Sequence, residues 1–189
     1  HLRLMRPQAI VINTARGGIT VSGGEPLLQM RFLEVLLRRC KEELGLHTAV
    51  DTSGFLGDRA SDEFLDLVDL FLLAIKSGDP ETYYLVASAQ LEPTLRFARR
   101  LSEHGSRTWI RYVLVPGLTD APENVEAVAA FAGTLSGGER VEILPFHQLG
   151  AGKWAELQLR YQLGEVASPS QSLVDRVESQ FRAHGLNVL

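Results

Sequence analysis

The segment Ser22-Gly23-Gly24-Glu25-Pro26 carries the strongest chemical signal in this sequence. It follows a short β-branched run and precedes an amphipathic helical pattern. Glycine lets a backbone bend sharply and lets a ligand approach it closely. Glu25 comes next to that bare backbone, where an acid can bind a cationic group of a ligand. The segment therefore predicts a ligand-binding turn between a strand and a helix.

Four further strand-like segments end in residues that suit a binding site. Three of these ends carry Asp51, Lys76 and His147, and the fourth runs into Pro116-Gly117. Ligands of parallel α/β folds bind at the carboxyl ends of the strands, where such residues meet. Together with Glu25 the set suits a zwitterion, with an acid for an ammonium group, a lysine for a carboxylate and hydroxyl-binding groups for a ribose.

Short apolar runs alternate with amphipathic runs along the chain. The runs that predict strands are 19–22, 47–51, 70–75, 108–115 and 140–144, and those that predict helices are 27–44, 61–68, 92–104, 122–135 and 172–184. Continuous apolar strands are typical of parallel sheets. The alternation predicts an α/β fold with right-handed crossovers, either an open doubly wound sheet or a whole or partial (β/α) barrel. We expect residues 1–189 to form a single domain.

The helix predicted over residues 27–44 should bury one apolar face. The helical spacing selects Leu28, Phe32, Leu36, Cys40 and Leu44 for that face, and Gly45 ends the helix. Cys40 is the only cysteine of the chain. We interpret it as a buried core residue, because free cysteines are commonly buried and inert.

Composition argues against several classes of function. The net charge is −4 and no dense run of Lys or Arg is present, so we expect no nucleic-acid partner. No apolar stretch is long enough to cross a membrane, and residues 1–7 lack the apolar core of a secretory signal. One cysteine excludes an internal disulfide and fits a reducing cytoplasm.

Four segments together resemble the glycyl-radical-enzyme activating enzymes of the radical S-adenosylmethionine superfamily. In chain order they are VSGGEPLLQ, DTSGF, IRYVLVPGLTD and VEILPFHQLGAGKW. The similarity runs from about Gly17 to the C-terminus and is greatest to the subgroup that acts on pyruvate formate-lyase. The order and placement of the segments carry the resemblance, rather than any single residue.

The resemblance implies a partial (β/α) barrel that uses S-adenosylmethionine and a [4Fe–4S] cluster held by three cysteines. One electron from the cluster cleaves the sulfonium, and the 5′-deoxyadenosyl radical then removes a backbone hydrogen from a glycine of the partner enzyme. The implied partners are a glycyl radical enzyme of the pyruvate formate-lyase type and an electron donor such as flavodoxin or ferredoxin. The resemblance also implies a cytoplasmic monomer.

The same resemblance assigns residues to the cofactor, although it assigns no catalytic side chain and no metal ligand. The matching positions are Gly23, Gly24, Glu25, Pro26, Asp51, Lys76, Arg111 and His147. The first four match the stretch that holds the methionyl ammonium, and Lys76 matches a residue near the methionyl carboxylate. Asp51 and His147 match residues that line the cofactor and the target glycine loop, and Arg111 matches a position at the pocket rim.

Two departures from the family pattern matter. The cluster motif CxxxCxxC, expected before the strand at 19–22, is absent, so we expect the chain as printed to hold no cluster and to be inactive by itself. Because residue 1 is His1 rather than methionine, we expect the first strand and the cluster ligands upstream of it. Ala74 replaces the aspartate of the family's usual Asp-X-Lys, which leaves open any cation site formed by that aspartate.

Two other functions stay open. A non-catalytic relative would bind S-adenosylmethionine or a partner without a cluster, and an unrelated α/β barrel enzyme would use the glycine turn for a phosphate. A phosphate site favours backbone N–H groups without an adjacent acid, so Glu25 argues against the second. Three upstream cysteines would favour the activating enzyme, and their absence would favour the non-catalytic relative.

Overall fold

Five parallel strands form one sheet in the computed structural model, which describes residues 17–136, 138–150, 152, 158 and 161–189. The strands are β1 (Gly18–Val21), β2 (His47–Thr52), β3 (Leu70–Ala74), β4 (Thr108–Leu114) and β5 (Gly138–Pro145). Their order in the sheet is their order in the sequence, and every described pairing is parallel. A doubly wound sheet would reverse its strand order at a switch point, whereas this sheet runs in one direction, as in a barrel.

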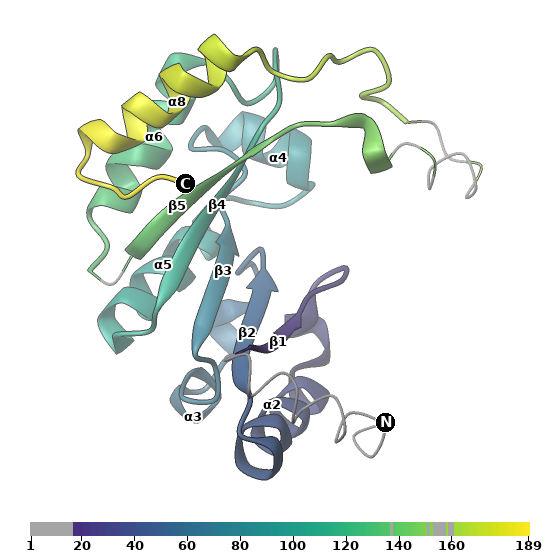
Figure 1. The fold of residues 1–189 in the computed structure, drawn as a ribbon, viewed down its shortest axis with the longest axis vertical. Helices are drawn as coiled ribbons and strands as arrows, with labels where there is room; N and C mark the ends of the chain where they lie inside the picture. Colours follow the sequence, from purple (N-terminus) through teal and green to yellow (C-terminus); the bar gives the residue numbers. More distant parts are fainter. Residues whose placement is uncertain (1–16, 137, 151, 153–157, 159–160) are drawn as a thin grey trace.

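Helices cover one face of this sheet (Figure 1). They are η1 (Pro26–Gln29), α2 (Met30–Leu44), η2 (Gly57–Arg59), α3 (Asp62–Leu65), α4 (Pro80–Ala87), α5 (Glu92–His104), α6 (Pro122–Gly133) and α8 (Gln171–Ala183). The short turn η3 (Gln148–Gly150), which follows β5, lies away from the sheet. Within the described residues, no helix is long and apolar enough to cross a bilayer.

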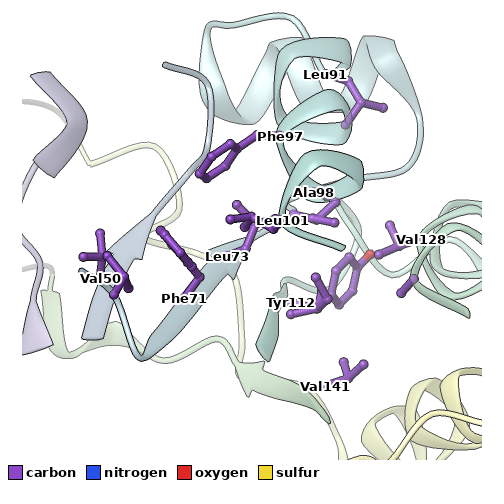
Figure 2. Packing of buried hydrophobic residues seen from close by; sticks show 14 of the residues in the cluster. Val50, Phe71, Leu73, Leu91, Phe97, Ala98, Leu101, Tyr112, Val128 and Val141 are labelled. Carbon is purple, nitrogen blue, oxygen red and sulfur yellow. The ribbon is translucent and has the colours of Figure 1, made fainter. Parts of the chain in front are cut away.

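The core lies between the sheet and these helices. Figure 2 shows Phe71 of β3 and Phe97 of α5 within it, and their rings meet edge to face at 5.7 Å. Along β3 and β4, buried residues alternate with half-buried ones, so one face of these strands meets the helices and the other stays open. This open face carries Leu72, Ala74 and Arg111.

One ion pair spans the open face of the sheet. Asp51 of β2 and Arg111 of β4 lie 2.7 Å apart at their charged groups although β3 lies between their strands. Neighbouring strands lie about 4.8 Å apart, so the two backbones are separated by roughly 10 Å, which the long side chain of Arg111 can bridge. The parallel strands in sequence order, covered by helices, confirm the predicted α/β fold of the partial-barrel type.

All five predicted strands and five predicted helical segments are present, with ends shifted by a few residues. The sequence analysis missed α4. Its signal is local: Asp79 accepts a hydrogen bond from the Thr82 N–H at 2.7 Å and Pro80 occupies the first turn, a favoured start for a helix.

The predicted buried face of the 27–44 helix was partly wrong. Leu28 and Phe32 are exposed at 67% and 63%, whereas Leu33, Leu37 and Cys40 are buried. The segment begins as the 3-10 turn η1 before α2, which rotates the first residues relative to the rest. Since apolar stripes lie on two sides of this segment, spacing alone could not decide which stripe packs on the sheet.

The C-terminal segment pairs with the outer edge of β5. Val188 forms a parallel bridge with Val141, and the Leu189 N–H donates to the Val141 carbonyl at 3.0 Å. The Val141 N–H donates in turn to the Asn187 carbonyl at 2.8 Å. The last residues of the chain therefore cover part of an edge that would otherwise be unpaired.

Candidate cofactor-binding site

The predicted site residues lie at or near the carboxyl ends of their strands, except Arg111, which is level with the end of the neighbouring strand β3. Glu25 follows β1, Asp51 is next to last in β2, Lys76 follows β3, Arg111 is central in β4 and His147 follows β5. Parallel pairing places these strand ends along one edge of the sheet. The structure thus gives the sequence-predicted residues a common edge, and the contacts below describe how they relate within it.

Glu25 connects the turn after β1 to the loop after β2. Its Oε1 accepts from the Leu27 N–H at 3.1 Å and from the Thr52 hydroxyl at 2.6 Å. Its Oε2 accepts from Ser53 twice, from the N–H at 3.0 Å and from the hydroxyl at 2.6 Å. A carboxylate offers about four acceptor positions, so these four donors occupy the whole group.

Arg111 connects two acids on the open face of the sheet. Its Nη1 lies 2.7 Å from Asp51 Oδ2, and its Nε lies 2.7 Å from Glu142 Oε2. The three side chains are 24–30% exposed, so they are only partly screened by water. Two carboxylates and one guanidinium leave a net charge of −1, and Asp51 Oδ1 forms no hydrogen bond with a described residue.

Ala74 explains how Arg111 reaches so far. In the strand register Arg111 is opposite Ala74 on β3, and Asp51 is opposite Leu72 on the other side of that strand. The guanidinium must therefore cross the face of β3 beside Ala74. A methyl group leaves room for this crossing, which a longer side chain would fill.

Lys76 has a cationic group without a described partner. Backbone pairing continues past β3, because the Ile75 N–H donates to the Arg111 carbonyl at 3.1 Å. Strand alternation then puts Lys76 on the open face, since Ile75 is buried in the core. Lys76 is half-buried, and its Nζ forms no hydrogen bond or ion pair within the part of the chain that the structure describes.

His147 and the glycine turn face solvent. The His147 ring accepts the Leu149 N–H on Nδ1 at 3.3 Å, which leaves Nε2 directed elsewhere. Gly23 has φ +122°, a conformation that favours glycine. A Cβ built on Gly23 or Gly24 would meet nothing within 4 Å, so this backbone borders open space.

Among the predicted residues, Asp51 and Arg111 are in direct contact, and Glu25 contacts Thr52, the neighbour of Asp51. Within the described part of the chain, Lys76 and His147 form no hydrogen bond or ion pair with these three. Ser53 and Glu142 were not predicted from the sequence. Each lies within a segment that was singled out, and a hydroxyl residue directly after a strand was the available signal for Ser53. Residues 151 and 153–157 of the last such segment lie outside the described residues.

Comparison with known proteins defines the class to which this fold and site belong. The model of the radical SAM superfamily matches residues 8–132, and the chain belongs to this superfamily. Its members use S-adenosylmethionine together with a [4Fe–4S] cluster.

Two relatives share much of the sequence. Pyruvate formate-lyase 1-activating enzyme of Escherichia coli (strain K12) is 35% identical over 180 residues, which are 94% of this chain and 73% of the relative. Pyruvate formate-lyase-activating enzyme of Staphylococcus epidermidis is 44% identical over 164 residues, which are 84% of this chain and 65% of the relative.

Solved structures agree with the fold. A domain of pyruvate-formate lyase-activating enzyme from Bacteroides vulgatus superposes with a TM-score of 0.77 at 27% identity and covers 92% of this chain and 98% of that domain. Streptococcus suis SuiB bound to S-adenosylmethionine has a TM-score of 0.62 at 15% identity, over 90% of this chain and 36% of SuiB, and is similar in fold alone.

The residues fit one of the two cofactors of the superfamily. A partly buried cation without a described partner, Lys76, and an acid with a free oxygen, Asp51, suit the carboxylate and ammonium of the methionyl group. The cluster does not fit in the same way. Cys40 is the one cysteine of the sequence, and it is fully buried among apolar residues of α2 and β1. These 189 residues therefore do not supply three cysteine ligands.

Proposed function

We propose that this chain activates a glycyl radical enzyme of the pyruvate formate-lyase class, with S-adenosylmethionine bound at the carboxyl edge of the sheet. The observation that carries the proposal is the half-buried Lys76 without a described partner, on the same face as the Asp51–Arg111–Glu142 group. Charges of opposite sign at neighbouring strand ends suit an amino-acid group, and the relatives, which are pyruvate formate-lyase-activating enzymes, supply the class of partner.

Each residue then has a distinct task at the site. Lys76 binds the methionyl carboxylate, and Asp51 accepts from the ammonium through Oδ1 while Arg111 holds Oδ2. The open backbone of Gly23 and Gly24, followed by Glu25 and Pro26, forms the wall beside the ammonium. His147, with Nε2 directed away from its own loop, is placed for a ribose hydroxyl or for the partner's glycine loop. When bound, S-adenosylmethionine supplies the group that takes a hydrogen atom from that glycine.

We also propose an electron donor, a cellular location and an oligomeric state for this protein. The electron needed by this chemistry comes from a small carrier such as flavodoxin or ferredoxin, and the protein acts in the cytoplasm as a monomer. A relative that binds S-adenosylmethionine without a cluster would require the same binding site, and the two functions differ in whether the cluster is present.

Titration calorimetry with S-adenosylmethionine tests the site. Losing a charged hydrogen bond costs about 1.5–3 kcal/mol, so we expect Lys76→Met and Asp51→Asn each to raise the Kd by roughly 10-fold to 100-fold. Arg38→Met, which removes an exposed cation from α2, is the control and should leave the Kd unchanged. Wild-type affinity in both Lys76→Met and Asp51→Asn would show that the cofactor does not bind at this edge.

A further inference from the structure

Three hydroxyl-bearing residues form a hydrogen-bonded chain that leads from α4 and α5 to the edge of the sheet proposed to bind the cofactor. Tyr83 Oη of α4 lies 2.8 Å from Thr94 Oγ1 of α5, and Thr94 Oγ1 donates to the Ser53 carbonyl at 2.8 Å. Tyr83 and Thr94 are 1% and 0% exposed. Buried hydroxyl groups are costly unless they are hydrogen-bonded, so this chain is a specific feature of the native state.

The direction of the chain follows from donor counting. The Ser53 carbonyl can only accept, so the single hydroxyl hydrogen of Thr94 is used there. Tyr83 must therefore donate to Thr94. Burial raises the pKa of Tyr83, the hydrogen bond with Thr94 partly offsets this, and the negative charge of Glu25 raises the pKa further. Tyr83 thus keeps the proton that it donates.

The chain continues from Ser53 into the glycine turn. Ser53 donates to Glu25 through both its N–H and its hydroxyl, and Glu25 accepts from the Leu27 N–H at the start of η1. A Cβ on Gly23 or Gly24 would touch nothing, so the two glycines themselves border open space. The turn lies between Val21, which pairs with Val50 of β2, and the fully buried Leu27, and the Glu25 carboxylate adds the side-chain hydrogen bonds that connect it to Thr52 and Ser53.

We propose that Tyr83 and Thr94 are positioning residues for the cofactor, acting through Ser53 and Glu25 on the Gly23–Gly24 turn. In this role Glu25 holds the turn and leaves direct contact with the methionyl ammonium to Asp51 and the turn backbone. The identity of the ligand rests on the proposed function. The connection itself rests only on the hydrogen bonds described above and can be tested without any ligand.

Thr94→Val tests the connection, because it keeps the shape of the residue and removes the hydroxyl. We expect the Kd for S-adenosylmethionine to rise about 10-fold, the effect of one buried hydrogen bond. Thr94→Ser restores a hydroxyl and should stay within about two-fold of wild type. Thr108→Val is the matched control, since Thr108 is 4% exposed and its hydroxyl also donates to a carbonyl, that of Ser106, at the opposite end of the sheet.

Hydrogen exchange in the free protein separates this inference from the proposed function. In Thr94→Val the amides of Ser53 and Leu27 should exchange about 10-fold faster than in wild type, and Thr108→Val should leave them unchanged. Unchanged exchange at both amides would overturn the connection, whatever the affinity. Faster amide exchange in Thr94→Val together with a wild-type Kd would show that the connection exists but does not position the cofactor.

Two further outcomes are also decisive. If wild-type protein does not bind S-adenosylmethionine, the proposed function fails, and hydrogen exchange at the amides of Ser53 and Leu27 decides whether the connection exists. If Thr94→Val does not fold, Tyr83→Phe replaces it, because it removes the outer donor and leaves the Thr94–Ser53 bond in place. We expect Tyr83→Phe to raise the Kd for S-adenosylmethionine about three-fold, because the Thr94–Ser53 hydrogen bond is weakened rather than lost. A wild-type Kd together with wild-type hydrogen exchange in this variant would contradict the inference.

Discussion

Arg111 Nη1 lies 2.7 Å from Asp51 Oδ2, although the two residues are on strands that are not neighbours in the sheet. The contact is possible because the Arg111 side chain is long and because Ala74, opposite Arg111 on β3, is small. Asp51 Oδ2 is held by this contact, whereas Asp51 Oδ1 remains available to a ligand. The same guanidinium holds Glu142, so a single cation orders two acids at the proposed site.

Removing this cation should affect both stability and binding. In Arg111→Met, Asp51 and Glu142 lose their common partner, and we expect the free energy of unfolding in urea to fall by about 1–2 kcal/mol, less than for a fully buried pair. The Kd for S-adenosylmethionine should rise, because Asp51 is no longer oriented. Arg111→Lys keeps the charge, but an ammonium group cannot bond both acids as a planar guanidinium does. We therefore expect its stability and its affinity to lie between those of wild type and Arg111→Met. Equal stability and affinity in all three proteins would contradict this account.

The size of residue 74 should control the contact. Ala74→Leu fills the crossing beside β3 and should separate Arg111 from Asp51 while leaving the neighbouring Arg111–Glu142 pair intact. A double-mutant cycle of Asp51→Asn with Arg111→Met should give a coupling free energy of about 1 kcal/mol in wild type and close to zero in the Ala74→Leu background. Ala74→Ser, which stays small, should keep the coupling. The same coupling in both backgrounds would exclude a role for the Ala74 methyl.

Much of this edge could be predicted from the sequence. Strand ends are marked by local apolar runs and turn residues, and parallel strands bring those ends together, so Glu25, Asp51 and Lys76 could be placed along one edge. The contacts among them could not be predicted in the same way. Arg111 contacts Asp51 across β3, and a contact between strands that are not neighbours leaves no pattern in any short segment of sequence.

The residues around Glu25 illustrate a second limit of prediction from sequence. Sequence spacing marks Glu25 as an acid next to a bare turn, and it cannot reveal that four donors from the protein already occupy the carboxylate. Thr94 is distant in sequence from Ser53 and lies on a helix whose pattern indicates only a buried face. Long-range hydrogen bonds of this kind arise from packing, which is decided after the local elements form.

Acid should weaken the protein partly through Asp69. Burial alone would raise the pKa of Asp69, and hydrogen bonds from Lys41 and from Thr48 outweigh burial and hold it below its usual value. A folded-state pKa below the unfolded value of about 3.9 gives stabilisation that is present above that pH and is lost as the pH falls through the folded pKa.

Unfolding measurements between pH 3 and pH 8 test this dependence. Asp69→Asn should lower the free energy of unfolding at pH 7 by about 1–3 kcal/mol and should flatten its decline below about pH 4. Asp66→Asn is a suitable control, because the Asp66 side chain is 73% exposed. An Asp69→Asn curve parallel to that of wild type down to pH 3 would exclude this source of acid sensitivity.

Cys40 should report the opening of α2. Its thiol is fully buried beside Leu46, and burial together with the nearby charge of Glu43 raises the pKa of the thiol. Because the thiolate is the reactive form, we expect labelling by a disulfide reagent to be at least about 100-fold slower in the native protein than in urea. Labelling rates should rise with denaturant in step with unfolding. Complete labelling within the mixing time under native conditions would show that the helix does not protect this residue.

The pairing of Val188 with Val141 has a practical consequence for attaching this protein to a surface or a probe. Leu189 lies beside Val141, four residues before Pro145 at the carboxyl end of β5, which at about 3.3 Å per residue is roughly 13 Å from the cofactor edge. A fluorophore or an immobilising tag joined after Leu189 therefore starts from the amino-terminal half of the sheet. Sensors built on this chain are better anchored there, with the proposed cofactor-binding edge directed away from the support.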